Sequence, residues 1–284
     1  MDPSSILHLD FASPVYRSID AKYSEISRLS DGFVRYSPTQ PIVSIIIPAY
    51  NEAKRLPVTL KKIRQFFNRY EMPVEVLSIV EKSQDATVSL SRDAVDGDPR
   101  FQVIDNIVQR GKGYAVRSGM LRARGEIVFY TDADLSTPIY EVINFLHFLI
   151  RNPQIEVLIG SRRRVSNQVS EDQKLPRKAA GIIFAQLVHR LTGIDVEDSQ
   201  AGFKAFRSSA SNEIFSIASI DGFAFDVEIL LLAKRFHYQV HSLPIDWIND
   251  TNSKVNLIVD SFRTIKDIAF VKRRVDERLM ELKI

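Results

Sequence analysis

The sequence predicts an α/β fold, in which a mostly parallel sheet is flanked by helices and followed by C-terminal amphipathic helices. From residue 42 onward, short β-branched runs alternate with helical patterns of roughly 10–15 residues, which is typical of right-handed βαβ units on a parallel sheet. The chain has 284 residues, of which 45% are hydrophobic and 26% are charged. A chain of this size and composition can bury a sizeable core without disulfide or metal staples.

The first half of the domain is the more regular. Its first run is β-branched and reaches Pro48, which we expect to end the strand, and an apolar helical face follows. We expect strands at 42–47, 74–80, 101–105, 126–130 and 156–160, and helices at 53–70, 85–95, 112–123 and 138–150. In the second half we expect helices at 177–191, 225–236 and 256–282, the last as one or two helices, and strands at 202–206 and 239–245.

Three regions follow from these patterns. Residues 1–40 show no sustained period and end in a breaker cluster, so we predict an N-terminal extension that packs on, or is tethered to, the main domain. Residues 41–250 form the α/β domain. Residues 251–284 form an amphipathic helical segment with basic edges, which suits either an anionic membrane surface or packing on the core or a second subunit.

Composition excludes several classes of protein and site. The chain has no cysteine, so disulfides and thiolate metal sites are excluded. No apolar run approaches the ~20 residues of a membrane span, and we read no signal peptide at the N-terminus. A formal net charge of +3 gives no nucleic-acid signature. We expect a cytoplasmic location, with peripheral contact to the cytoplasmic face of a membrane left open.

The strongest local signal is Asp132-Ala133-Asp134, which follows the fourth expected strand. Ligands of parallel sheets lie at the carboxyl ends of the strands, where this pair is expected together with segments 48–52, 81–85 and 160–162. Two carboxylates so placed would share Mg²⁺ or Mn²⁺ with a diphosphate, because these cations prefer oxygen ligands. The alternative is a solvated turn with an aspartate cap for the next helix.

Two further loops carry polar side chains at the same edge. After the first strand, Asn51 suits a helix cap, but the segment also lies where a nucleotide base would sit. After the second strand, Glu81 and Asp85 would hydrogen-bond a base or ribose, or else Ser83 or Asp85 caps a helix. The sequence leaves these alternatives open.

A third loop reads Arg110-Gly111-Lys112-Gly113. It matches neither GxxxxGK[ST] nor GxGxxG. Two glycines around a lysine at a helix start let backbone N–H groups approach an anion, which we favour over a flexible turn with a solvated lysine.

The fifth strand leads into a basic segment. It is either a solvated loop or a site that binds an acceptor phosphate in bidentate fashion. Its basic residues are Arg162, Arg163, Arg164, Lys174, Arg177 and Lys178.

The motifs taken together resemble family-2 glycosyltransferases of the GT-A fold, and within them the dolichyl-phosphate glucosyltransferase and polyprenyl-phosphate glycosyltransferase group. The resemblance covers residues 42–255, and its last two segments are the most discriminating. The motifs are IIIPAYNEAKRL, VEKSQDAT, QRGKGYAVRSGM, ARGEIVFYTDADLSTP, GSRR, DSQAGFKAF and GFAFDVEILLLAKRFHY.

The resemblance implies a role for each matching residue. Asp134 is implied as the principal metal ligand beside Asp132, and Arg162 with Arg177 or Lys178 would hold the acceptor phosphate. Asp198 and Gln200 would lie near the sugar and acceptor, and Asp226 and Glu228 near the donor sugar unless they are structural. The implied nucleotide contacts are Tyr50, Glu52, Glu81 and Asp132, and we add Pro48, Lys112 and Ala133 to the expected donor-binding set.

Two departures from the family pattern matter. Where relatives often carry two aspartates and then Gly-Ser, this chain has Glu81-Lys82-Ser83, which leaves the base open. Many relatives also have C-terminal membrane spans, and none is read here.

The resulting hypothesis is inverting transfer of a hexose, with glucose expected first, from a UDP-sugar to a polyprenyl (dolichyl-type) phosphate, with Mg²⁺ or Mn²⁺. Three alternatives stay open. One is a GDP-mannose-dependent polyprenyl-phosphate mannosyltransferase. Another is a transferase for a soluble hydroxyl acceptor, which would need Asp198 or Asp226 as general base. The last is an inactive nucleotide-sugar binding protein. A nucleic-acid partner is not expected, and a homo-oligomer is left open.

Overall fold

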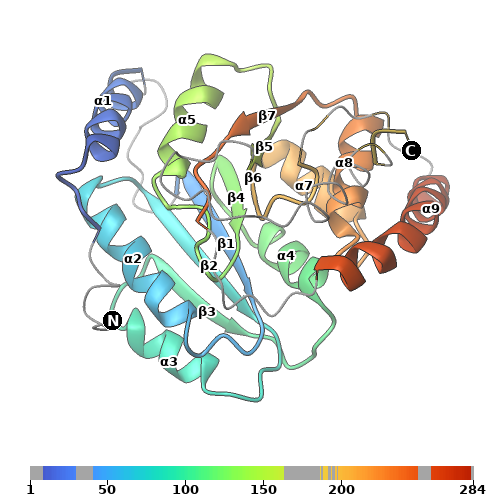
Figure 1. Ribbon diagram of the computed structural model, residues 1–284, viewed down its shortest axis with the longest axis horizontal. Helices are drawn as coiled ribbons and strands as arrows, with labels where there is room; N and C mark the ends of the chain where they lie inside the picture. The colour runs from blue at the N-terminus through green and yellow to red at the C-terminus, as the bar shows by residue number, and fades with distance from the viewer. Residues whose placement is uncertain are drawn as a thin grey trace.

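A computed structural model describes residues 9–29, 41–162, 198–248 and 257–282, together with 186, 188–190, 193 and 196; within 257–269 it describes the backbone alone. A seven-stranded sheet in the order β3-β2-β1-β4-β6-β5-β7 has helices on both faces (Figure 1). In this described part, β6 is antiparallel to β4 and β5, and the other neighbouring strands pair in parallel. The predicted fold class is confirmed.

The elements have the following bounds. The strands are β1 (Val43–Ala49), β2 (Val74–Val80), β3 (Phe101–Asp105), β4 (Ile127–Thr131), β5 (Val157–Ser161), β6 (Phe203–Arg207) and β7 (Val240–Pro244). The helices are α1 (Pro14–Leu29), α2 (Leu56–Arg69), α3 (Thr87–Ala94), α4 (Lys112–Met120), α5 (Glu141–Arg151), α7 (Ser208–Ile217), α8 (Phe225–Arg235) and α9 (Leu257–Leu282). The helix expected at 177–191 lies largely outside the described residues.

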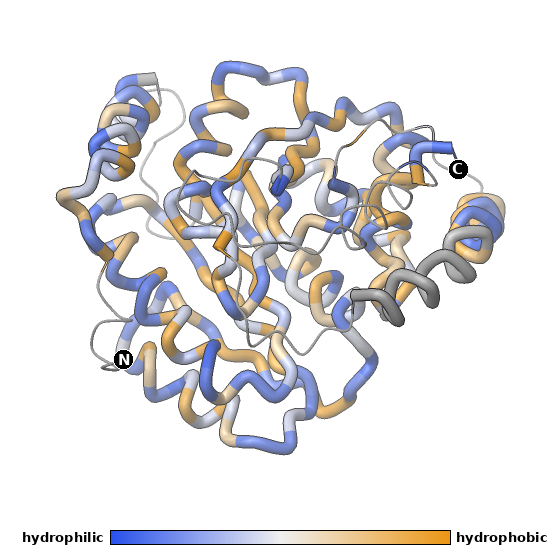
Figure 2. Tube along the Cα trace, viewed as in Figure 1, coloured by the Kyte–Doolittle hydropathy of each residue, from blue (hydrophilic) through white to orange (hydrophobic). Residues whose placement is uncertain are grey.

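Two apolar clusters sandwich the sheet. One joins it to α1, α2 and α5, and the other joins its opposite face to α4, α7, α8 and α9. Neighbouring residues of β1 alternate between them, with Ile45 and Ile47 in the first cluster and Ile46 in the second. Because both faces are buried, the central strands are continuous apolar runs, and Figure 2 shows hydrophobic segments in the middle of the molecule.

The first strand corrects one expectation. Pro48 does not end it, because β1 continues to Ala49. The carbonyl of Ala49 accepts a hydrogen bond from the backbone of Glu81 on the β2 side, so the preceding residue faces β4. Pairing with β4 already ends at Ile46. Proline therefore costs no ladder hydrogen bond at this position.

Two helices were not expected from the sequence. One is α7, which follows β6 directly. The other is α1, within the region read as lacking a period. Its buried residues Tyr16, Ile19 and Ile26 face α2 and α5, and Glu25 pairs with His147 and Arg151. Tyr16, Ile19, Tyr23 and Ile26 recur at helical spacing, so the prediction that residues 1–40 lack a sustained period is wrong for this segment.

The C-terminal segment is one helix, α9. From residue 270 onward, Val271, Val275 and Leu279 are buried in the cluster that contains α8. This spacing places one face of the helix on the core. Among the described residues, no helix combines the length and apolar character needed to cross a bilayer.

Candidate active site

The loops after β1 and β2 are tied together at the carboxyl edge of the sheet. Asn51, with a φ of 53°, accepts a hydrogen bond from the Gln84 backbone (2.8 Å), and its own N–H donates to Ser83 Oγ (3.0 Å). Asn51 therefore joins two loops, and α2 begins without a side-chain cap from it. Asp85 accepts from the backbone of Ala53 (3.3 Å) and Thr87 (3.0 Å), so it fixes the same junction.

The acidic pair lies beside these loops, immediately after β4. Asp132 Oδ1 accepts a hydrogen bond from Lys112 Nζ (2.6 Å), and its side chain is 40% exposed. Asp134 Oδ1 accepts from the backbone of Ser136 (2.9 Å), and its side chain is 18% exposed. Between them, the buried Ala133 carbonyl accepts from Thr59 Oγ1 of α2 (2.7 Å). The structure therefore brings together the predicted Lys112, Asp132, Ala133 and Asp134.

Gly202, next to the antiparallel strand β6, lies in close contact with the Asp132 carboxylate. Gly202 precedes β6, and a Cβ atom added there would approach Asp132 Oδ2 more closely than the 3.0 Å that real Cβ atoms keep. Any side chain at this position would displace the Asp132 carboxylate. Glycine leaves the Asp132 carboxylate in place through this close approach, and not through a left-handed φ.

On the predicted nucleotide side, Glu81 is buried and already bonded. Its carboxylate accepts hydrogen bonds from the backbone N–H groups of Arg110 (3.0 Å) and Gly111 (2.9 Å). The anion that this glycine loop binds here is thus a protein carboxylate, which corrects the expectation of a free anion site at these two amides. The loop in turn presents Lys112 to Asp132.

The other residues of the predicted donor set are varied in exposure. Tyr50 is exposed at the mouth of the first loop, whereas Pro48 is buried. Glu52 is held by the Arg55 guanidinium, and Nη1 of Arg55 lies 3.9 Å from Asp134 Oδ2. Arg55 therefore connects the first loop to the acidic pair.

The neighbouring carboxylates keep Lys112 protonated. Burial alone would lower the pKa of Lys112, but Asp132, Asp226 and Asp134 together raise it above its ordinary value. Lys112 is thus a fixed positive charge beside two carboxylates at neutral pH. Such a group draws in and orients an anionic ligand without moving a proton.

The predicted acceptor side is built on one ion pair. Arg162 donates to Asp198 through Nε (2.5 Å) and Nη2 (2.8 Å), and its guanidinium lies 5.9 Å from the centre of the Trp247 ring. Burial alone would lower the pKa of Arg162, but Asp198 raises it. Gln200 lies in the turn that follows Asp198. Arg163, Arg164, Lys174, Arg177 and Lys178 lie outside the described residues.

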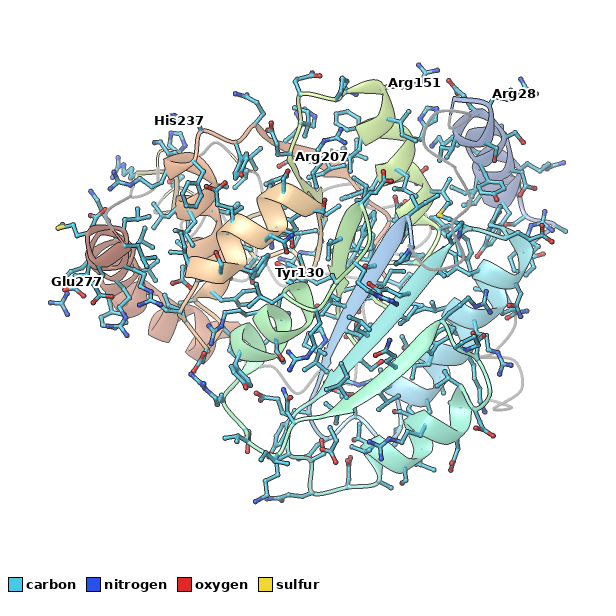
Figure 3. All side chains as sticks on the ribbon, turned by 180° about the vertical axis from the view of Figure 1, so that it is seen from behind. Arg28, Tyr130, Arg151, Arg207, His237 and Glu277 are labelled. Carbon is cyan, nitrogen blue, oxygen red and sulfur yellow. The ribbon has the colours of Figure 1, made fainter. Side chains whose placement is uncertain are left out.

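Asp226 belongs to a buried network and not to an exposed base. It accepts hydrogen bonds from Tyr130 Oη (2.5 Å) and Lys204 Nζ (2.6 Å). Tyr130 lies in the middle of the molecule, beside α4 (Figure 3). Glu228 is likewise buried, and it accepts from the backbone of Ser219 (2.9 Å) and Ile220 (2.8 Å). Of the two roles considered for these carboxylates, the geometry favours the structural one.

Comparison with known proteins identifies the family to which a chain with this site belongs. The Glycosyl transferase family 2 model matches residues 44–215, which is more than half of the chain. The chain belongs to this family. The predicted resemblance and enzyme class are confirmed.

Relatives of this family-2 glycosyltransferase are similar over most of its length. A dolichyl-phosphate beta-glucosyltransferase of Saccharomyces cerevisiae is 29% identical and aligns with 90% of this chain and 82% of its own. The Drosophila melanogaster enzyme of the same name is 33% identical over 75% of this chain and 69% of its own. Among solved structures, glucosyl-3-phosphoglycerate synthase of Mycobacterium tuberculosis has a TM-score of 0.63 at 17% identity, covering 89% of this chain and 85% of that one. That likeness shows the fold.

The donor atoms of this glycosyltransferase fit a divalent cation shared with a ligand. Asp132 and Asp134 offer hard oxygen donors and remain partly exposed. Among the described residues, no group of three or more histidine, aspartate or glutamate side chains is placed to hold a metal. A site of two carboxylates suits Mg²⁺ or Mn²⁺ completed by phosphate oxygens. A structural neighbour has been crystallised with Mn²⁺ and UDP-glucose, and another crystal of it holds Mg²⁺ and UDP.

From the sequence, no function was assigned to four residues of the site, namely Arg55, Gly202, Lys204 and Trp247. Arg55 stood inside a quoted motif beside its partner Glu52, but its approach to Asp134 was not predictable, and Trp247 lies far in sequence from Arg162. Gly202 and Lys204 stood inside a quoted motif, but only the pairing of β6 with β4 brings them to Asp132 and Tyr130. An isolated lysine in an apolar strand was the one available hint.

Proposed function

We propose that this chain transfers glucose from UDP-glucose to the phosphate of a dolichyl-type polyprenyl phosphate, with Mg²⁺ or Mn²⁺ at Asp132 and Asp134. The similarity to the yeast dolichyl-phosphate beta-glucosyltransferase carries the proposal. It extends over 90% of this chain, so it includes both the acidic pair and the pair of Arg162 with Asp198. The enzymes of that name in Dictyostelium discoideum and Homo sapiens are also 29% identical.

The proposed reaction needs positioning more than proton transfer. A phosphate monoester acceptor is already ionised near neutral pH, so one of its oxygens attacks the anomeric carbon without a general base. The new bond forms on the face opposite UDP while the bond from that carbon to the diphosphate breaks, and UDP leaves with the electron pair. This outcome inverts the anomeric centre. The absence of an exposed base at Asp226 is consistent with such an acceptor.

Different charged residues of the chain serve the donor and the acceptor. Lys112 offers a positive charge to the diphosphate, and Asp132 and Asp134 would hold the cation that neutralises charge on the departing UDP. Arg162, held in a fixed plane by Asp198, presents its remaining N–H groups to the acceptor phosphate. Aligning two anionic reactants in this way removes much of the entropic barrier.

A lipid acceptor requires contact with a membrane surface. On α9, the exposed Lys272, Arg273 and Arg274 follow the exposed Phe270, whose ring lies 5.8 Å from the Arg273 guanidinium. Basic and aromatic side chains on one helix suit the interface of an anionic membrane. We infer peripheral attachment at the cytoplasmic face through this part of α9.

Acceptor choice is tested with purified protein, Mn²⁺ and radiolabelled sugar donors. UDP-glucose with dolichyl phosphate should give labelled lipid, while GDP-mannose, or a soluble acceptor such as glycerol, should give little product. Arg162→Ala should lower kcat/KM for dolichyl phosphate by on the order of 10–100-fold, as expected for lost charge-assisted hydrogen bonds. Arg151→Ala is the matched control, because Arg151 is an exposed arginine whose ion pair is with Glu25 of α1. Preference for the soluble acceptor, or full activity of Arg162→Ala, would contradict the proposal.

A further inference from the structure

A fully buried lysine lies directly beneath the site. Lys204 is on β6, paired with Tyr130 of β4 and Ile159 of β5, and its side chain is 0% exposed. Its Nζ donates to Asp226 Oδ1 (2.6 Å) and to the backbone carbonyl of Ala201 (2.7 Å). Burial lowers the pKa of Lys204 despite the attraction of Asp226.

The hydrogen bond from Lys204 to Ala201 holds the turn at 198–202. This turn lies between the predicted acceptor side at Arg162 and the acidic pair at Asp132. The N–H of Ala201 donates to the carbonyl of Asp198 (3.3 Å), closing a turn whose first side chain holds Arg162. The next residue, Gly202, lies against the carboxylate of Asp132. The turn at 198–202 is therefore connected to the acceptor side at one end and to the acidic pair at the other.

Burying a lysine only to fill space in the core is energetically unfavourable. Burying an ion pair costs desolvation that a well-packed apolar pair avoids, so such pairs are weak evidence for a stabilising role. The position is central in the sheet, and on the same face its cross-strand neighbour Tyr130 and the following Phe206 belong to an apolar cluster, where an apolar side chain would fit. What the ammonium supplies, and an apolar side chain cannot, is a donor for the carbonyl of Ala201.

We propose that Lys204 is a positioning residue that holds the turn at 198–202, and with it Asp198 and Gly202, in the arrangement that glucosyl transfer requires. The inference rests on the proposed function for the choice of assay. Lys204 touches neither substrate. It acts through Ala201, so its loss should affect the rate of transfer more than donor binding.

The first test is the kinetics of Lys204→Met. We expect kcat to fall by about 100-fold, the size of loss that a misplacement of roughly 1 Å causes. KM for UDP-glucose should change by less than about threefold, because Asp132 and Asp134 keep their bonds to Lys112 and Ser136. A large rise in KM with unchanged kcat would overturn the proposal.

Two further variants separate positioning from stability. Lys204→Met combined with Asp226→Asn removes both buried charges, so its Tm should recover toward that of the parent while kcat stays low. Asp226→Asn alone keeps Lys204 and its bond to Ala201, and its kcat should stay within about tenfold of the parent, a smaller loss than that of Lys204→Met. Recovery of kcat together with Tm in the double variant, or an equal loss in Asp226→Asn, would show that Lys204 is only structural.

Hydrogen–deuterium exchange gives a readout that does not depend on the acceptor. The amide of Ala201 should exchange faster in both Lys204→Met proteins and at the parental rate in Asp226→Asn, whereas equal exchange in all of them would refute positioning. If the parent transfers glucose to no polyprenyl phosphate, the proposed function fails, and the exchange pattern still decides the role of Lys204.

Discussion

Single side chains at the sheet edge work as pairs of opposite charge. Lys112 faces Asp132, Arg162 faces Asp198, and Lys204 faces Asp226. Arg162 is fixed by two hydrogen bonds to its partner and Lys204 by full burial, whereas Lys112 makes one hydrogen bond to Asp132 and its side chain is 21% exposed. The site is thus preorganised for anionic ligands before any ligand arrives, which is the condition under which electrostatic stabilisation is most effective.

Gly202 gives a sharp prediction at this scale. Gly202→Ala places a methyl group against Asp132 Oδ2, so the carboxylate must move. We expect the affinity for UDP in the presence of Mn²⁺ to fall by on the order of tenfold, equivalent to ~1.4 kcal/mol. Isothermal titration calorimetry measures it. Gly222→Ala is the matched control, because a Cβ there meets no atom within 4 Å and its φ is unstrained. Equal binding by the two variants would contradict the reading of Gly202.

At the scale of elements, hydrophobic periodicity predicted most of the strands and helices, because both faces of the central strands are buried. It missed α1, which lies outside the regular alternation of strands and helices, and α7, which follows β6 without a turn. The acidic pair was predictable, since it directly follows a strand. The pairings of Arg162 with Asp198 and of Lys204 with Asp226 were not, because they depend on the order in which β4, β6 and β5 lie side by side.

The connection between α3 and β3 predicts a pH dependence of stability. The Arg100 hydrogen bonds hold the pKa of Asp98 below its usual value, and Arg64 of α2 lies 3.2 Å from the same carboxylate. A depressed pKa gives stability that is present above the unfolded pKa near 3.8 and is lost as pH falls toward the folded value. Asp98→Asn should therefore cost ~1–3 kcal/mol at pH 7, and the difference from the parent should shrink below pH 4. Urea unfolding across pH measures this, and a difference independent of pH would contradict it.

For the molecule as a whole, α1 and α9 lie at opposite ends of the domain and cover different faces of it (Figure 1). If α9 meets the membrane, the protein should co-sediment with vesicles that contain anionic lipid and not with neutral vesicles. Replacing Lys272, Arg273 and Arg274 with glutamine should weaken this binding strongly, since each basic residue contributes ~1 kcal/mol near such a surface. Equal sedimentation of parent and variant would place the membrane contact elsewhere.

Asp132 and Asp134 are proposed to hold a cation and, through it, the diphosphate of the donor. The most direct test of this claim is the dissociation constant of UDP with and without Mn²⁺, for the parent and for Asp134→Asn. For the parent, Mn²⁺ should tighten binding by at least about tenfold, equivalent to ~1.4 kcal/mol, and for Asp134→Asn this gain should vanish while the Tm stays close to that of the parent. The same gain from Mn²⁺ in both proteins would contradict the claim.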